Sequence, residues 1–137
     1  MIKQVIVVRK NLNMRKGKIA SQCSHASMKV FFDRMTRSCT TMPEGSQLFI
    51  TEYTPAMMTW LDWKEGEPGF TKIVVGCEGE QELHSIEEKC NAANIPCAII
   101  LDNGLTEFGG VKTYTCIAVG PDESEKIDLI TGEYKLL

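Results

Sequence analysis

Long apolar segments are absent from this sequence of 137 residues. The apolar run from Val5 to Val8 is shorter than the core of a secretory signal peptide, which needs about 7 to 15 residues. Nothing approaches the roughly 18 apolar residues of a membrane span. We therefore predict a soluble, cytoplasmic protein with no membrane partner.

The sequence also lacks the signatures of a metal centre or a disulfide framework. Its six cysteines form no C-x-x-C pair, and its two histidines, His25 and His84, have no clustered cysteine partners. Most of the cysteines lie among apolar neighbours, where a reduced thiol behaves as a small hydrophobic side chain. We predict a reducing compartment, no metal ion and no cofactor.

Internal repeats, linkers and low-complexity stretches are missing as well. A chain of this length fits one domain and can bury roughly 68% of the surface that its unfolded form would expose. We therefore expect residues 1–137 to form a single domain.

Positive charge is concentrated in one part of the chain. Residues 1–37 hold nine Lys and Arg against the single acid Asp33, whereas the remaining hundred residues hold six against seventeen. Such an asymmetry predicts a basic face on an acidic protein, suited to binding phosphates through counterion release. The alternative interpretation is an ordinary solvated helix surface.

The order of predicted elements indicates an α/β fold. Predicted strands cover residues 2–8, 71–77, 96–101 and 112–119, and predicted helices cover residues 16–37, 55–63 and 80–94. The chain closes with a short helix, a turn at Thr131 and Gly132 and a terminal extended piece, while residues 38–54 have no assignment. We expect a single-domain three-layer sandwich, with a small mixed sheet of about four strands and helices on both faces.

The first predicted helix carries a line of polar residues beside its apolar stripe. Lys18, Gln22, His25 and Lys29 recur at helical spacing. The N-terminus of the helix offers free N–H groups to a phosphate or carboxylate, and the neighbouring lysines add positive charge. In the alternative, structural interpretation, His25 is a satisfied boundary histidine and Gln22 is an ordinary surface residue.

Two other residues of this helix are poor candidates for a nucleophile. Ser24 and His25 are adjacent, so their side chains point about 100° apart and do not form a dyad easily. Cys23 lies in the apolar stripe, which favours burial over catalysis.

A second candidate site lies in the segment 100–110, "ILDNGLTEFGG". Asp102 follows the most hydrophobic strand of the chain, and ligands in open α/β sheets bind beyond the carboxyl ends of strands. The loop that follows brings the hydroxyl of Thr106 close to this carboxylate. The alternative is an Asp-Asn-Gly turn in which the side chain bonds its own backbone.

The two segments together resemble one family, the peptidyl-tRNA hydrolases of the second type. The stretch 7–28, "VVRKNLNMRKGKIASQCSHASM", is similar to the family's N-terminal signature, and "LDNGLTEF", "TYTCIAVGP" and "LITGEYKLL" resemble its C-terminal half in order and spacing. Leu105 and Glu107 depart from the family pattern, which has an arginine and a glutamine there. Extra residues also stand around 38–70 and near Glu123.

This resemblance implies hydrolysis of the ester that joins a peptide to the terminal ribose of tRNA. It assigns catalysis to Lys18, Asp102 and Thr106: Asp102 positions water or orients Lys18, Lys18 stabilises the oxyanion or the leaving ribose oxygen, and Thr106 supplies a polarising hydrogen bond. The expected substrate-binding residues are Gln22, His25 and Thr113, which shape the pocket, and Arg15, Lys16 and Lys10, which hold the tRNA backbone.

The resemblance further implies a homodimer, although no heptad pattern or apolar stripe in the sequence supports one. Two other functions stay open. One is a tRNA-binding module of the same fold without hydrolase activity, and the other is a protein-interaction module whose basic helix meets an acidic partner.

Overall fold

The structure is a computed structural model that describes residues 1–52 and 58–137. The first part of the helix predicted over 55–63 lies outside the described residues. The elements, in chain order, are β1 (Ile2–Arg9), the 3-10 helix η1 (Lys10–Leu12), α1 (Lys16–Phe32), β2 (Thr36–Thr41), β3 (Gln47–Glu52), α2 (Met58–Glu65), β4 (Lys72–Cys77), α3 (Glu80–Ala92), β5 (Cys97–Asp102), β6 (Thr113–Glu123), α4 (Ser124–Thr131) and β7 (Lys135–Leu136). No helix among the described residues is long and apolar enough to cross a lipid bilayer.

The main sheet is mixed and has five strands in the order β5-β6-β1-β4-β7. β1 pairs in parallel with β4 and antiparallel with β6, while β5 and β7 pair antiparallel with β6 and β4 respectively. The fifth strand, β7, is the terminal extended piece that the sequence predicted. Because β5 and β1 both run antiparallel to β6, the C-terminal ends of β1, β4 and β5 lie at one edge of the sheet.

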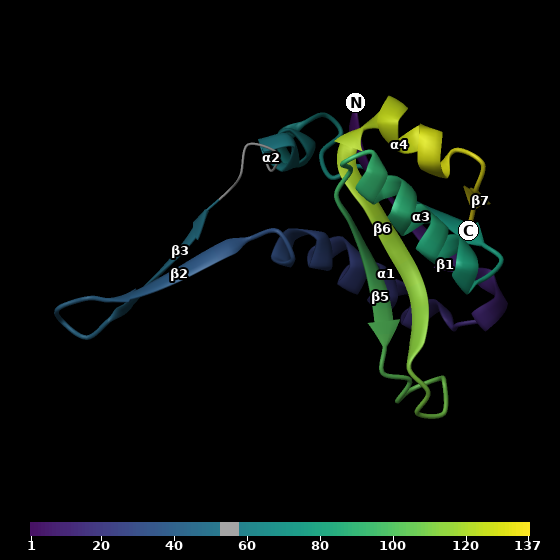
Figure 1. Cartoon of the computed structure of the whole chain (residues 1–137), viewed down its shortest axis with the longest axis horizontal. Coiled ribbons are helices and arrows are strands. Elements are labelled where there is room, and N and C mark those ends of the chain that lie inside the picture. Colours follow the sequence, from purple (N-terminus) through teal and green to yellow (C-terminus); the bar gives the residue numbers. More distant parts are fainter. Residues whose placement is uncertain (53–57) are drawn as a thin grey trace.

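Helices cover both faces of this sheet (Figure 1). Alternate residues of β1 pack to opposite sides: Val5 and Val7 join the apolar cluster under α3 and α4, whereas Ile6 and Val8 join the cluster under α1 and α2. A strand buried on both faces needs a continuous apolar run, which is what residues 5–8 supply. The predicted α/β fold with helices on both faces is confirmed.

A two-stranded hairpin projects away from this body (Figure 1). It consists of β2 and β3, and we call residues 36–52 the arm. Every residue of both strands is exposed. A hairpin that buries neither face has no alternation of apolar and polar residues, which is why the sequence pattern left this region unassigned.

Two predicted boundaries were wrong. The first helix ends at Phe32 rather than Arg37, because the apolar repeat stops at Val30 and the Thr-rich segment that starts at Thr36 forms β2. The strand predicted over 112–119 continues to Glu123, because its last residues pair with the start of β1.

Candidate active site

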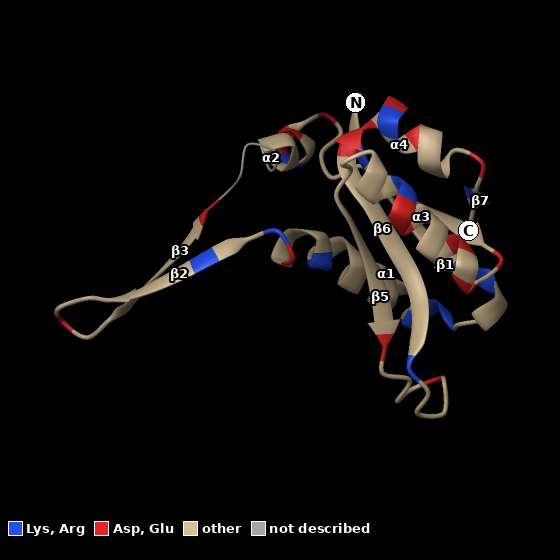
Figure 2. Ribbon diagram, viewed as in Figure 1, with Lys and Arg blue, Asp and Glu red and all other residues tan. Residues whose placement is uncertain are grey.

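A polar hollow opens where the N-terminal turns of α1 meet the C-terminal end of β5. Its volume is about 440 Å³, and its lining consists of Gly17, Lys18, Ser21, Gln22, His25, Asp102, Thr106 and Glu107. In Figure 2 the red end of β5 lies beside the blue N-terminal part of α1. Helical spacing places the α1 members on one face, and the sheet edge supplies the carboxylate.

Lys18 and Asp102 form an ion pair in this hollow. Lys18 Nζ lies 3.0 Å from Asp102 Oδ1, and the two side chains are only 10% and 15% exposed. Lys18 Nζ also donates to Thr106 Oγ1 at 2.8 Å and lies 5.4 Å from the centre of the Phe108 ring. Because little water reaches the pair, its attraction is screened less than that of a surface pair.

A buried hydrogen-bond chain supports the carboxylate from behind. Gln22 Nε2 donates to Asp102 Oδ1 at 3.1 Å, and Gln22 Oε1 accepts from Thr115 Oγ1 at 2.7 Å. Gln22 is 1% exposed and Thr115 is fully buried. The Thr115 hydroxyl holds the amide oxygen of Gln22 on its own side, so the amide nitrogen points toward Asp102. Thr115 thus sets the orientation of the Gln22 amide.

The pKa of Asp102 lies below its ordinary value. Burial alone would raise this pKa, but the hydrogen bond and charge of Lys18, the backbone N–H of Gly104 and the amide of Gln22 outweigh it. The Gly104 N–H donates to Asp102 Oδ2 at 2.9 Å. A carboxylate held by three donors stays ionised and accepts protons poorly, so it is better suited to fixing Lys18 than to deprotonating water.

The loop after β5 depends on a glycine. Gly104 has φ +77°, and a Cβ at this position would lie 2.1 Å from the carbonyl oxygen of Val111. Only glycine tolerates both the left-handed backbone and this close approach. The tight loop presents its N–H to Asp102 and brings Thr106 back over Lys18.

Glu107 offsets the positive charge at the start of α1. Its Oε2 accepts from the backbone N–H of Arg15 at 3.3 Å, and its Oε1 lies 3.4 Å from Arg15 Nε. The carboxylate therefore stands at the positive end of the helix dipole, where a negative charge is favourable. The side chain of Arg15 is 86% exposed.

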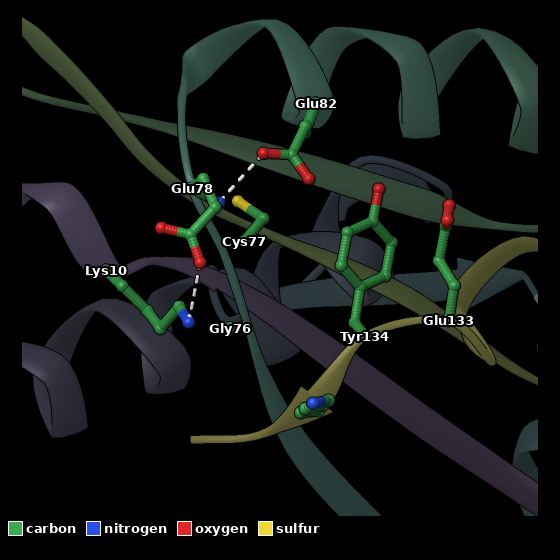
Figure 3. A pocket seen from close by; sticks show the side chains of 8 residues that line it. Lys10, Gly76, Cys77, Glu78, Glu82, Glu133 and Tyr134 are labelled. Carbon is green, nitrogen blue, oxygen red and sulfur yellow. Dashed lines mark hydrogen bonds and ion pairs between the residues drawn. The ribbon is translucent and has the colours of Figure 1, made fainter.

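Lys10 lies at a second hollow, of about 340 Å³, on the same edge of the sheet (Figure 3). Its Nζ is 2.7 Å from Glu78 Oε1, and the hydrogen bond and charge of Glu78 raise the pKa of Lys10. Glu82 accepts the backbone N–H groups of Glu78 and Gly79, which caps α3. The charge of Lys10 is thus already partnered within the chain.

The hollow brings together most of the residues predicted from the sequence: Lys18, Gln22, His25, Asp102 and Thr106 all line it. Arg15 immediately precedes α1 and Lys16 is its first residue, and both are exposed. Thr113 is not among the described lining residues: its hydroxyl donates to the Val111 carbonyl at 2.8 Å, and it pairs with Asp102 across the strands. Lys29, the last member of the polar line, pairs with Asp33 instead.

Thr115 is a site residue that the sequence reasoning missed. Cys116 and Ala118 face α1, so strict alternation would turn Thr115 toward α3. The register shifts between Ile100 and Leu101, where β6 has one extra residue, and this bulge turns Thr115 toward Gln22. The sequence offers no signal for such a bulge.

An ammonium, an ionised carboxylate and a hydroxyl therefore meet at one hollow. This set can position water and stabilise an oxyanion, which is the chemistry of a hydrolase. Within residues 1–52 and 58–137, no three His, Cys, Asp or Glu side chains converge to hold a metal ion.

Comparisons with known proteins identify the family. Residues 2–137 match the family described as peptidyl-tRNA hydrolase PTH2. A peptidyl-tRNA hydrolase of Methanocaldococcus jannaschii is 36% identical over 136 residues, which covers 99% of this chain and 100% of the relative. A peptidyl-tRNA hydrolase of Sulfurisphaera tokodaii is 39% identical over 135 residues, which covers 98% of each chain.

The chain belongs to the PTH2 family of peptidyl-tRNA hydrolases, and its activity is that of an ester hydrolase. The resemblance seen in the sequence is confirmed. A solved structure of an Agrobacterium protein of unknown function has a similar fold, with a TM-score of 0.53 at 8% identity, covering 98% of this chain and 96% of the other.

Proposed function

We propose that the Lys18–Asp102 hollow is the place where this chain hydrolyses the ester between a peptide and the terminal ribose of tRNA. The observation that supports this assignment is the 3.0 Å ion pair, shielded from solvent and lining the hollow. Water attacks the ester carbonyl, the bond to the ribose oxygen breaks, and the proton lost by water ends on that oxygen.

Lys18 stabilises the negative charge that develops in this reaction. An ammonium has three N–H donors, and the described contacts use two of them, toward Asp102 and Thr106. The third is available for the oxyanion or for the leaving ribose oxygen. A donor fixed before the substrate arrives needs no reorganisation during the reaction.

Asp102 orients Lys18 rather than acting as the base. Both of its oxygens already accept hydrogen bonds, and its pKa is lowered. Thr106 accepts from Lys18, so its own O–H is free to donate to the carbonyl or to hold the attacking water.

The remaining predicted residues act on binding. Gln22 and His25 shape the hollow, and Thr113 supports the strand end opposite Asp102. Lys16 and Arg15 contact tRNA phosphates by charge rather than by base sequence. Arg15 and Lys10 contribute less than their charges suggest, because Glu107 and Glu78 partner them.

We place this enzyme in the cytoplasm as a single domain that works as a homodimer. All six cysteines are free, which suits a reducing compartment. The homodimer follows from the family resemblance.

The test is release of peptide from peptidyl-tRNA by the purified chain, with free tRNA as a binding control. We expect release by the wild type and a loss of at least about a hundredfold in Lys18→Ala. Lys29→Ala is the matched control, because Lys29 lies on the same helix in a carboxylate pair outside the hollow lining. Binding of tRNA without release would instead favour a binding module, and neither binding nor release would favour a protein-interaction module.

A further inference from the structure

The lining of the hollow carries more negative than positive charge. It holds one ammonium, that of Lys18, and two carboxylates, those of Asp102 and Glu107. Lys18 and Asp102 lie 3.0 Å apart, so their charges offset each other. In the described contacts Glu107 pairs with Arg15, which is not among the lining residues. The negative charge of Glu107 is therefore the one that a ligand in the hollow would meet.

The Glu107 carboxylate has acceptor capacity left for such a ligand. A carboxylate offers about four lone-pair sites. The described contacts use two of them and are long, at 3.3 Å from Arg15 N to Oε2 and 3.4 Å from Arg15 Nε to Oε1. The Arg15 side chain is 86% exposed, and ion pairs with such partners contribute little, whereas the Glu107 side chain is only 15% exposed. Glu107 can therefore accept a further hydrogen bond in a site that little water reaches.

Glu107 also lies close to the groups that act on the ester. It follows Thr106 directly in the chain, and the Thr106 hydroxyl is 2.8 Å from Lys18 Nζ. Its other neighbour, the backbone N–H of Arg15, precedes Lys18 by three residues, about one turn of α1. A side chain attached to the reacting ester thus has only a short distance to cross to this carboxylate.

The tRNA part of the substrate has no positive group to place against Glu107. Its phosphates are negative, and like charges brought together weaken binding. The ribose and the bases are neutral, and in a peptidyl ester the α-nitrogen of the last amino acid belongs to an uncharged amide. The cation that suits Glu107 is therefore the side chain of that last amino acid. Lysine carries such a charge on a flexible four-carbon stem, and arginine carries it on a planar fork that matches a carboxylate.

We propose that Glu107 is a specificity-determining residue, which makes the hollow favour peptides whose last residue, the one esterified to tRNA, is lysine or arginine. The cationic side chain donates to the Glu107 carboxylate while Lys18 faces the ester. The hollow, about 440 Å³, lies within the size range of ligand sites, roughly 300–1,000 Å³. This inference rests on the proposed function, because it requires that the ester is hydrolysed in this hollow.

A purely structural role for Glu107 has a different consequence. If the carboxylate only stabilises the start of α1 and offsets Arg15, its removal changes the stability of the helix end and the affinity for every tRNA alike. The ratio of rates for two esters of the same tRNA then stays constant. This ratio therefore separates recognition of the substrate from support of the fold.

Two esters of one tRNA test the proposal. Nα-acetyl-lysyl-tRNA and Nα-acetyl-norleucyl-tRNA differ only in the ammonium of the side chain. For the wild type we expect kcat/KM to be at least about fivefold higher for the lysyl ester, because a hydrogen bond between charged groups forms in a mostly buried place. Glu107→Gln should bring the ratio to about one, and Glu107→Asp, which keeps the carboxylate, should retain part of the preference.

Glu88→Gln is the matched control. It removes the same charge from an exposed residue of α3, which packs on the opposite face of the sheet from α1. Its ratio should equal that of the wild type. The comparison of the two esters with the wild type needs no variant to fold, and denaturant unfolding checks that the Glu107 variants are folded.

The outcomes separate this inference from the proposed function. Equal rates of the wild type on the two esters, or a lysyl preference that survives Glu107→Gln, would overturn the role of Glu107 and leave the hydrolytic site standing. Wild-type rates in Lys18→Ala on both esters would instead overturn the placement of hydrolysis in the hollow, and this inference with it.

A third ester of the same tRNA shows which positive group Glu107 recognises. Norleucyl-tRNA with a free α-amino group carries its charge next to the ester carbonyl rather than at the end of the side chain. It should gain no advantage over Nα-acetyl-norleucyl-tRNA that depends on Glu107. An advantage for this ester that Glu107→Gln removes, without one for the lysyl ester, would overturn the assignment to the side chain.

Discussion

The hollow and the arm differ in which groups they bury: the hollow buries paired polar groups, whereas the arm exposes apolar side chains. Both oxygens of Asp102 accept hydrogen bonds from the chain, and among the described residues no buried side-chain nitrogen or oxygen is left without a partner. The arm has an unpaired strand edge and exposed apolar side chains. The buried polar groups of the hollow are therefore paired within the chain, whereas the arm leaves a strand edge and apolar side chains exposed.

The largest expected difference between the two regions concerns charge. Asp102→Asn should lower the rate of peptidyl-tRNA hydrolysis by about a hundredfold, because the neutral amide no longer holds the Lys18 ammonium. Glu52→Gln in the arm should leave the rate unchanged. Single-turnover kinetics measure both, and equal rates for Asp102→Asn and wild type would show that the reaction does not need this carboxylate.

The pH dependence of the unfolding free energy reports on the same carboxylate, Asp102. The folded pKa of Asp102 is lowered, so its contribution is present above the unfolded value of about 3.9 and is lost as pH falls through the folded value. The wild type should therefore have a higher unfolding free energy than Asp102→Asn at neutral pH, and this advantage should shrink only below about pH 4. Denaturant unfolding at a series of pH values measures it. An advantage that was already lost near neutral pH would contradict the lowered pKa of Asp102.

The hollow and the arm also differ in how much backbone strain a substituted glycine would cause. Gly104→Ala forces a left-handed alanine against the Val111 carbonyl and should cost at least about 1–3 kcal/mol of unfolding free energy. Gly45→Ala has the comparable φ of +93° in the turn of the arm but open space around its Cβ, so it should cost less. Paired chemical denaturation curves make the measurement, and equal costs would mean that the loop after β5 relaxes freely.

Buried hydrogen bonding provides a third contrast. Thr115→Val leaves the oxygen of the buried Gln22 amide without its donor and should cost about 1–3 kcal/mol. The same change at exposed Thr40 should be nearly neutral or slightly stabilising. Thr115→Ser should keep most of the wild-type unfolding free energy, because it retains the hydroxyl that donates to Gln22. A serine variant as unstable as the valine variant would show that Thr115 acts through its methyl group.

The smallest effect is expected at Glu107. Glu107→Gln removes the carboxylate beside the exposed Arg15 and should tighten tRNA binding a few-fold at low salt, with a steeper salt dependence. The pair itself contributes little to stability, about 0–1 kcal/mol. Glu44→Gln in the arm is the control and should leave the salt slope unchanged, so identical slopes for both variants would exclude a phosphate contact at Arg15.

More of the hollow than of the arm could be predicted from the sequence, because burial imposes a residue pattern on the elements that form the hollow. Lys18, Gln22 and His25 follow helical spacing, and Asp102 follows a buried strand, so periodicity placed them correctly. Thr115 depends on a bulge that only the pairing of β5 with β6 reveals. Among the described residues both strands of the arm are exposed throughout, so burial leaves no pattern in their sequence.

Lys18 and Asp102 are proposed to act as one unit, and a double-mutant cycle on kcat/KM measures whether they do. Lys18→Ala and Asp102→Ala should each lower kcat/KM by about a hundredfold, and the double variant by about the same amount, because either change alone disables the pair. A double variant that loses about ten-thousand-fold, the product of the two single effects, would show that Lys18 and Asp102 work independently rather than as a pair.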